Sequence, residues 1–290
     1  MSIRLLALDL DGTLLNSHGE VTPRNRIAID KARQLGVRIA IVTGRRFRDA
    51  RPIALDLGLD VPIIAHNGAL TKHARTLQTV AVRPLSMESA RRALRVGREY
   101  GADPLISDDH EGLGVLVYDH LSGDNAALLQ YITWARRVHG EEGGAVREVD
   151  SLEEYLDHEP IHVAYSGSCV AMNHLQATLR RELGSSVKIF CTTYPRKDFA
   201  LLDIVNSQAS KGIGVAAVAA EFGMGREEVM AIGDNFNDFE MLQFAGTGVV
   251  MANAERELQE IPNFHTTASN DDDGVAISIE KFILRRGLRP

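Results

Sequence analysis

The sequence has few of the features that mark secreted or membrane-bound proteins. Its two cysteines, Cys169 and Cys191, show no metal-site spacing, and so few cysteines suit a reducing compartment better than a disulfide scaffold. No apolar run reaches the ~18 residues that a membrane-spanning helix needs. The apolar start is interrupted by Asp9 and Asp11 and lacks the small-residue cleavage site of a secretory signal. We therefore expect a cytoplasmic protein that has no membrane as a partner.

Basic residues are too few for a nucleic-acid-binding surface. The chain carries 32 lysines and arginines against 39 aspartates and glutamates, a formal net charge of −7. Because a negative protein repels nucleic acids and anionic membranes, we exclude both as main partners. An anionic substrate would need local positive charge at its site. The sequence leaves the oligomeric state open.

The overall composition is that of a soluble globular protein. Hydrophobic residues make up 44% and charged residues 24% of the 290 positions. This length fits one large domain or two ordinary ones.

Two acids follow the first buried strand. The apolar run 3–8 leads directly into Asp9-Leu-Asp11-Gly-Thr-Leu14, which is typical of a strand that delivers two carboxylates at its C-terminal end. An unpaired buried charge costs several kcal/mol, and a hard cation such as Mg²⁺ is the usual compensation. Gly12 permits the tight turn that follows.

Two other interpretations of this segment exist. Asp-x-Asp-Gly also begins a calcium loop, and Glu20 stands at the twelfth position of such a loop. However, Leu14 occupies the sixth position, where that loop needs glycine, and a strand precedes it in place of a helix. The second alternative, a surface turn with two solvated acids, depends on the rest of the chain.

Strands and helices alternate in the outer thirds of the chain. Strands are expected at 37–42, 61–65, 229–232 and 247–251, with helices at 24–35, 211–222 and 238–245. This rhythm predicts a Rossmann-like α/β core with a parallel sheet. Between about 84 and 204 the pattern is mixed, with a loop at 140–144, and predicts an inserted α+β domain. The predicted domains are therefore 1–83 with 205–290 as the core, and 84–204 as the insertion.

Polar residues follow several of the predicted core strands. Thr43, Asn67 and Asp234 each stand just beyond a strand, as Asp9 and Asp11 do. In an open α/β sheet the ligand crevice lies outside the carboxyl ends of the strands, so these residues are expected to converge.

The converging residues suit a phosphate bound beside a metal. Asp9 and Asp11 would repel Asp234 and Asp238 unless a divalent cation lay between them. Thr43 offers a hydroxyl and Gly44 an amide, while Lys211 puts an ammonium on the first turn of a helix. A cation there is unfavourable unless an anion binds close by. Together these groups predict a phosphate cradle.

Four motifs in order resemble those of the haloacid dehalogenase-like (HAD) phosphatases. They are Asp9-Leu-Asp11-Gly-Thr-Leu, Thr43-Gly-Arg45, Lys211-Gly and Gly233-Asp234-Asn-Phe-Asn237-Asp238. Three further segments resemble signatures of the Cof-type subfamily, which carries an inserted type IIB cap: Asn67-Gly68, Met251-Ala-Asn253-Ala254 and Asn270-Asp-Asp-Asp273-Gly274. The resemblance spans essentially the whole chain, and it makes the solvated-turn interpretation untenable.

The resemblance implies a role for each motif residue. Asp9 would attack phosphorus, form an aspartyl-phosphate and bind Mg²⁺. Asp11 would protonate the leaving alcohol and then deprotonate the attacking water, and its backbone carbonyl would bind the metal.

The remaining motif residues would hold the phosphoryl group and the metal. Thr43, Gly44, Lys211 and Asn237 would contact the substrate. Asp234 would complete the Mg²⁺ site, and Asp238 would orient it.

The sequence thus predicts a Mg²⁺-dependent phosphatase acting on a small phosphorylated metabolite that the sequence does not identify. A phosphomutase and a non-catalytic phospho-ligand sensor are the alternatives. A dinucleotide fingerprint at 212–217 is disfavoured because a polar turn precedes it in place of a strand.

Overall fold

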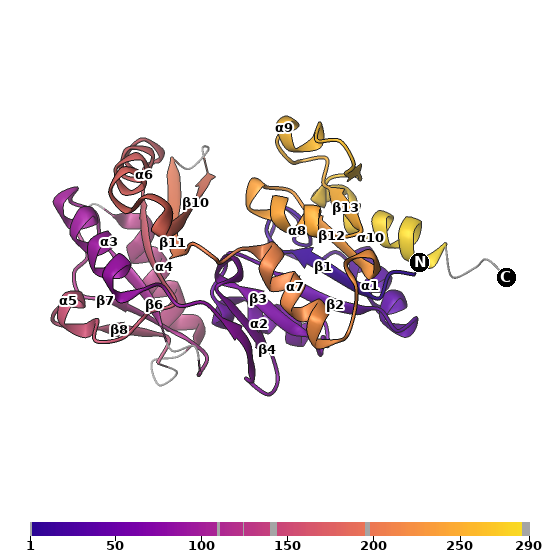
Figure 1. Ribbon diagram of the computed structural model, residues 1–290, viewed down its shortest axis with the longest axis horizontal. Coiled ribbons are helices and arrows are strands. Elements are labelled where there is room, and N and C mark those ends of the chain that lie inside the picture. The colour runs from indigo at the N-terminus through magenta and orange to yellow at the C-terminus, as the bar shows by residue number, and fades with distance from the viewer. Residues whose placement is uncertain (1, 109–110, 124, 140–143, 195–197, 286–290) are drawn as a thin grey trace. The chain divides into compact units, whose positions relative to one another are not determined.

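The computed structural model describes residues 2–108, 111–123, 125–139, 144–194 and 198–285 (Figure 1). The chain divides into two compact units, Met1–Ala81 with Ser210–Pro290, and Val82–Ala209. The domain boundaries expected from the sequence, 1–83, 84–204 and 205–290, remain a prediction.

The first unit is built on an eight-stranded sheet. The strand order is β14-β13-β12-β1-β2-β3-β4-β5. Pairing is parallel from β14 to β3, and β4 adds antiparallel to β3. The strands are β1 (Leu5–Asp9), β2 (Arg38–Val42), β3 (Pro62–Ala65), β4 (Leu70–His73), β5 (Thr79–Val82), β12 (Val229–Gly233), β13 (Thr247–Val250) and β14 (His265–Thr266). The predicted parallel core sheet is confirmed.

Strand β1 lies inside this sheet because it is apolar on both faces. Leu5 is paired with Val229 of β12 on one side and with Arg38 of β2 on the other. All five β1 residues are buried, as expected of a central parallel strand between two layers of helices. The last of them is Asp9.

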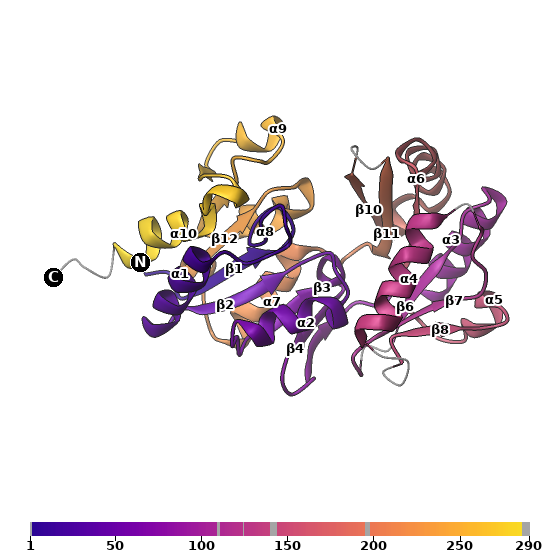
Figure 2. The same ribbon diagram turned by 180° about the vertical axis from the view of Figure 1, so that it is seen from behind.

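Helices cover the first sheet on both faces, as the opposite views of Figures 1 and 2 show. Residues of α7 and α8 join Leu5 and Ala7 of β1 in one apolar core. The helix α1 begins as predicted, with Thr22 accepting a hydrogen bond at the N-cap and Pro23 in the first turn. The helices are α1 (Pro23–Gln34), α2 (Phe47–Asp56), α7 (Lys211–Glu221), α8 (Phe239–Phe244), α9 (Arg256–Gln259) and α10 (Gly274–Ile279).

The second unit is built on a six-stranded mixed sheet in the order β10-β11-β9-β6-β7-β8. Four of its pairings are antiparallel, and β7 and β8 are parallel. The strands are β6 (Leu105–Asp108), β7 (Val115–Tyr118), β8 (Val146–Glu148), β9 (His162–Gly167), β10 (Val187–Tyr194) and β11 (Phe199–Asn206). The helices are α3 (Met87–Glu99), α4 (Ala126–His139), α5 (Leu152–Tyr155) and α6 (Cys169–Leu183).

This unit confirms the predicted α+β insertion. One core cluster joins α3 and α6 to the sheet, and a second joins α4 to it. The predicted loop at 140–144 lies outside the described residues except for Gly144. Within the described parts of the chain, we find no helix long and apolar enough to span a bilayer.

Candidate active site

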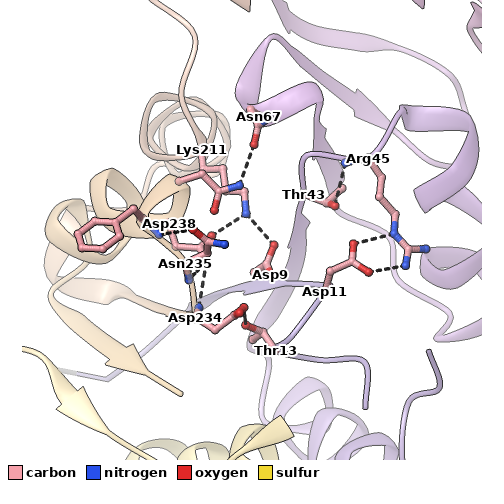
Figure 3. A network of polar contacts seen from close by, with 12 residues as sticks. Asp9, Asp11, Thr13, Thr43, Arg45, Asn67, Lys211, Asp234, Asn235 and Asp238 are labelled. Atoms are coloured by element: carbon pink, nitrogen blue, oxygen red, sulfur yellow. Dashed lines mark hydrogen bonds and ion pairs between the residues drawn. The ribbon is translucent and has the colours of Figure 1, made fainter. Parts of the chain in front are cut away.

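The candidate site lies where β1 and β12 end. Because β1 pairs in parallel with both β12 and β2, the residues that follow these strands emerge at one edge of the sheet. Asp9 ends β1, Thr43 follows β2, and Asp234 follows β12 (Figure 3). The structure therefore brings together strand ends that are far apart in the sequence, as expected.

A buried lysine joins two of the predicted acids. Lys211 Nζ lies 2.7 Å from Asp9 Oδ1 and 2.6 Å from Asp238 Oδ1. The side chains are 2% exposed for Lys211, 6% for Asp9 and 0% for Asp238. Ser210 places the lysine, because its side chain caps α7 by accepting a hydrogen bond from the Ile213 amide.

The charges at this point do not balance within the protein. Burial, together with Asp238 and Asp234, raises the pKa of Asp9 well above its usual range, although Lys211 acts in the opposite direction. Burial and Asp238 raise the pKa of Asp234 to about 6. Burial by itself would lower the pKa of Lys211, but the attraction of Asp238 and Asp9 outweighs it and raises that pKa. The site thus favours additional positive charge.

Asp238 also shapes the loop after β12. Its Oδ2 accepts hydrogen bonds from the Asp234 amide at 3.0 Å and the Asn235 amide at 3.1 Å. A Cβ on Gly233 would lie 2.5 Å from Asp238 Cγ, so this strand end requires glycine. Asp238 therefore positions Asp234 while it holds Lys211.

Three carboxylates could hold one metal ion. Asp9, Asp234 and Asp238 each offer an oxygen, and these atoms all lie within 4.8 Å of one another. Thr13 donates a hydrogen bond to Asp234 Oδ1 at 2.7 Å and fixes that carboxylate. Carboxylate oxygens are ligands that Mg²⁺ prefers. The pKa values of Asp9 and Asp234 are raised because burial and neighbouring carboxylates disfavour their charged forms, and a bound cation would offset this repulsion. The donor set fits the predicted metal.

The Asp11 side chain lies apart from this cluster. Its carboxylate forms a bidentate ion pair with Arg45, with Nε to Oδ2 at 2.8 Å and Nη2 to Oδ1 at 2.5 Å. Figure 3 shows this pair on the opposite side of Asp9 from Asp238. Half of the Asp11 side chain is exposed. The predicted part of Asp11 in metal binding, through its backbone carbonyl, remains a prediction.

The predicted phosphate-binding residues follow β2 and β12. Thr43 is buried, and its hydroxyl accepts a hydrogen bond from the Arg45 amide at 3.1 Å. A Cβ on Gly44 would lie 3.2 Å from the Asn67 side-chain amide, so glycine at this position lets Asn67 approach the backbone closely. Asn237 donates to Asn67 Oδ1 at 3.0 Å and thereby connects the loop after β12 to the turn after β3.

Sequence reasoning missed two contacts in this region. It did not identify the Thr13 hydroxyl as the partner of Asp234, nor Arg45 as the partner of Asp11. Thr13 and Arg45 both belong to the motifs quoted from the sequence, so their position alone indicated that they lie near the site. The sequence contains no signal for the direction in which their side chains point.

Comparison with known proteins agrees with these motifs. The sequence model of the haloacid dehalogenase-like hydrolases matches residues 6–279. The chain is 30% identical over 300 residues to 5-amino-6-(5-phospho-D-ribitylamino)uracil phosphatase YwtE of Bacillus subtilis, covering 97% of this chain and 98% of that protein. It is 29% identical over 283 residues to pyridoxal phosphate phosphatase YbhA of Escherichia coli, covering 95% and 97%.

Solved structures share the fold over nearly the whole length. A haloacid dehalogenase-like hydrolase from Bacteroides thetaiotaomicron superposes with a TM-score of 0.79 at 25% identity, covering 97% of this chain and 99% of that one. The HAD subclass IIB sugar phosphatase BT4131 gives a TM-score of 0.76 at 20% identity, covering 96% and 98%. The parallel core sheet and the mixed second sheet are the arrangement of this subclass.

Proposed function

Because this chain belongs to the haloacid dehalogenase-like hydrolases and is one of their phosphatases, we propose that it hydrolyses a small phosphorylated metabolite through an aspartyl-phosphate on Asp9. The observation that carries the proposal is the buried Lys211 bridge between Asp9 and Asp238 beside a three-carboxylate cluster. Such a site holds a nucleophilic carboxylate next to positive charge.

Asp9 is the proposed nucleophile. A carboxylate oxygen of Asp9 attacks phosphorus, and the bond from phosphorus to the leaving oxygen breaks as the new one forms. A Mg²⁺ ion bound by Asp9, Asp234 and Asp238 would neutralise phosphoryl charge that otherwise repels the nucleophile. Burial of Asp9 keeps bulk water from solvating and weakening this nucleophile.

Asp11 is the proposed general acid and base. It gives its proton to the departing alkoxide and then takes one from the water that attacks the aspartyl-phosphate, which releases phosphate and free Asp9. To reach the reacting oxygens, its carboxylate must leave Arg45, and its exposed position permits this rotation.

Lys211, Thr43 and Gly44 are the proposed phosphoryl ligands. The Lys211 ammonium has three N–H donors, and Asp9 and Asp238 engage two of them, which leaves one for a phosphoryl oxygen. The Thr43 hydroxyl accepts from the Arg45 amide, so its own proton is available to donate. Asn237 lies on the same side through its contact with Asn67.

The names of two relatives support a proposal for the class of substrate. The two curated relatives carry names of phosphatases for pyridoxal phosphate and for a phosphorylated ribitylamino-uracil. We therefore propose a soluble phosphomonoester with a cyclic or polyol leaving group as the partner, and we propose that the unit 82–209 selects that leaving group.

The test is phosphate release from p-nitrophenyl phosphate and a panel of phosphorylated metabolites, with Mg²⁺ or with EDTA. Asp9→Asn should lower turnover about 10³-fold, and EDTA should abolish it. The matched control is Asp30→Asn, which removes an exposed acid of α1 and should leave turnover unchanged. Folded wild type that releases no phosphate from any ester contradicts the proposal, and transfer of the phosphoryl group to a second site on the substrate would indicate the mutase alternative.

A further inference from the structure

Two asparagines near the C-terminus hold the loop that carries Asp11. Asn253 Nδ2 donates to the Gly12 carbonyl at 2.8 Å, and Asn270 Nδ2 donates to the Leu15 carbonyl at 2.9 Å. Both belong to segments that resemble signatures of the Cof-type subfamily. They approach the loop from positions more than 200 residues further along the chain.

The two asparagines form one connected unit. The backbone N–H of Asn270 donates a hydrogen bond to Asn253 Oδ1 at 3.0 Å, which fixes the orientation of the Asn253 side-chain amide. That orientation aims Asn253 Nδ2 at Gly12. Asn270 is 9% exposed and its bond to Leu15 is buried, so replacing the donor would leave a carbonyl without its partner.

The loop between Asp9 and Leu15 also has backbone hydrogen bonds of its own, at its base. Leu10 O accepts hydrogen bonds from the Thr13 and Leu15 amides. These two bonds close the loop at its base, and the turn at Asp11 and Gly12 extends beyond them. Gly12 has φ +80°, and a Cβ there would lie 2.3 Å from Asp234 Oδ2. The turn is thus held against Asp234 on one side and by Asn253 at its carbonyl.

Neighbouring contacts anchor the far part of the same loop. Asp271 Oδ1 accepts from the Ser17 amide at 2.7 Å, and Asp273 Oδ1 accepts from the Thr22 hydroxyl at 2.5 Å. These contacts lie beyond Leu15 and do not touch the turn that carries Asp11. They supply a natural control for the two asparagines.

We propose that Asn253 and Asn270 are positioning residues that set the place of the Asp11 carboxylate through the Gly12 and Leu15 carbonyls. The proposal rests on the proposed function, in which Asp11 protonates the leaving group. Neither asparagine touches the reacting atoms, and their effect is on the geometry of a group whose misplacement by about 1 Å can cost up to about 10²-fold in rate.

The proposal predicts a dependence on the leaving group. p-Nitrophenolate is a weak base and departs with little help from an acid, whereas phenolate is more basic and needs the Asp11 proton. Asn253→Ala should therefore lower kcat/KM for phenyl phosphate about tenfold and for p-nitrophenyl phosphate less than about threefold. A role in general stability alone would lower both by the same factor.

The experiment compares Asn253→Ala and Asn270→Asp with Asp271→Ala on both esters in saturating Mg²⁺. Asn270→Asp keeps the side-chain shape while it removes the donor to Leu15. Asp271→Ala breaks a contact of the same loop that lies beyond the turn, so it should change both rates by the same small factor. Equal losses on the two esters in the asparagine variants, or no loss, would overturn the proposal.

A second measurement does not depend on activity. In wild type, the Thr13 and Leu15 amides are protected from exchange by their hydrogen bonds to Leu10 O. A loop that has lost an asparagine contact should open these bonds more often, so hydrogen exchange of the peptide that contains residues 10–16 should be faster in Asn253→Ala and Asn270→Asp than in wild type. Unchanged exchange overturns the positioning role whatever the activity. Wild type that hydrolyses neither ester counts against the proposed function, whereas active wild type with ester-independent losses counts against this proposal alone.

Discussion

Replacement of Lys211 by methionine should strongly destabilise the metal-free protein. The side chain is 2% exposed, and it lies between Asp9 and Asp238 at 2.7 and 2.6 Å. Methionine has a similar length and no charge, so Lys211→Met leaves two facing buried carboxylates without a counter-charge. Removing one partner of a buried ion pair costs about 3–5 kcal/mol.

A smaller effect of the same substitution has the opposite sign. Lys211 stands on the first turn of α7, where a cation interacts unfavourably with the helix dipole. Its removal should return less than about 1 kcal/mol, so the loss of charge compensation dominates. A net loss of about 2–5 kcal/mol is expected.

Urea unfolding in EDTA and in Mg²⁺ measures both parts of this reasoning. Because Mg²⁺ supplies positive charge to the same carboxylates, it should stabilise Lys211→Met more than wild type. Adding Asp238→Asn to Lys211→Met should recover part of the loss, since it removes one of the two facing charges. Lys31→Met, at an exposed lysine of α1, should change stability by less than about 0.5 kcal/mol. A Lys211→Met protein as stable as wild type in EDTA would refute the reasoning.

Three further predictions concern single positions. Gly12→Ala should cost about 1–3 kcal/mol and weaken Mg²⁺ activation, because its Cβ would meet Asp234 at 2.3 Å; urea melts and Mg²⁺ titration of turnover check this. Ser210→Ala should cost about 1 kcal/mol in the same melts, because it removes the α7 cap on the Ile213 amide. Burial raises the pKa of Asp203 to about 7, so its ionisation reduces stability progressively as the pH rises from about 4 to 7. Asp203→Asn should therefore be more stable than wild type at pH 8, by about 2 kcal/mol, and no more stable at pH 4. The size is kept to about half of what the full pKa shift would give, because 18% of the side chain is exposed to water. An equal difference in stability at both pH values would contradict this prediction.

The core of the fold could be predicted because its signals are local. Five of the six residues at 3–8 are apolar, which predicts a buried strand before Asp9, and Thr22-Pro23 predicts a helix start. The predicted core strands all form, with ends shifted by at most two residues. Convergence of the polar residues then follows from the geometry of parallel sheets.

Other elements leave too little pattern in the sequence. The strands β8 and β14 have three and two residues, which is too short to show an alternation of apolar and polar positions. The strand β6 was also missed, although all four of its residues are buried, because an apolar pair followed by Ser107 and Asp108 does not differ from a turn.

Side-chain partners in the site depend on contacts across long stretches of chain. Asn253 and Asn270 meet Gly12 and Leu15 only after the whole sheet has formed. The pairing of Asp11 with Arg45 depends on the rotamers of two partly exposed side chains, which no local propensity fixes. Motif positions therefore indicated that Asp9, Asp234 and Asp238 lie together, and the structure was needed to show how they are held and that the Asp11 carboxylate pairs with Arg45.

The most direct test of the central claim is the site of covalent phosphorylation. Wild type turning over p-nitrophenyl phosphate is quenched in acid, digested, and mapped by mass spectrometry for one added phosphoryl group. The account predicts the group on Asp9, and its absence in Asp9→Asn. Turnover without any phosphorylated peptide, or a phosphoryl group on Asp11 in place of Asp9, would contradict it.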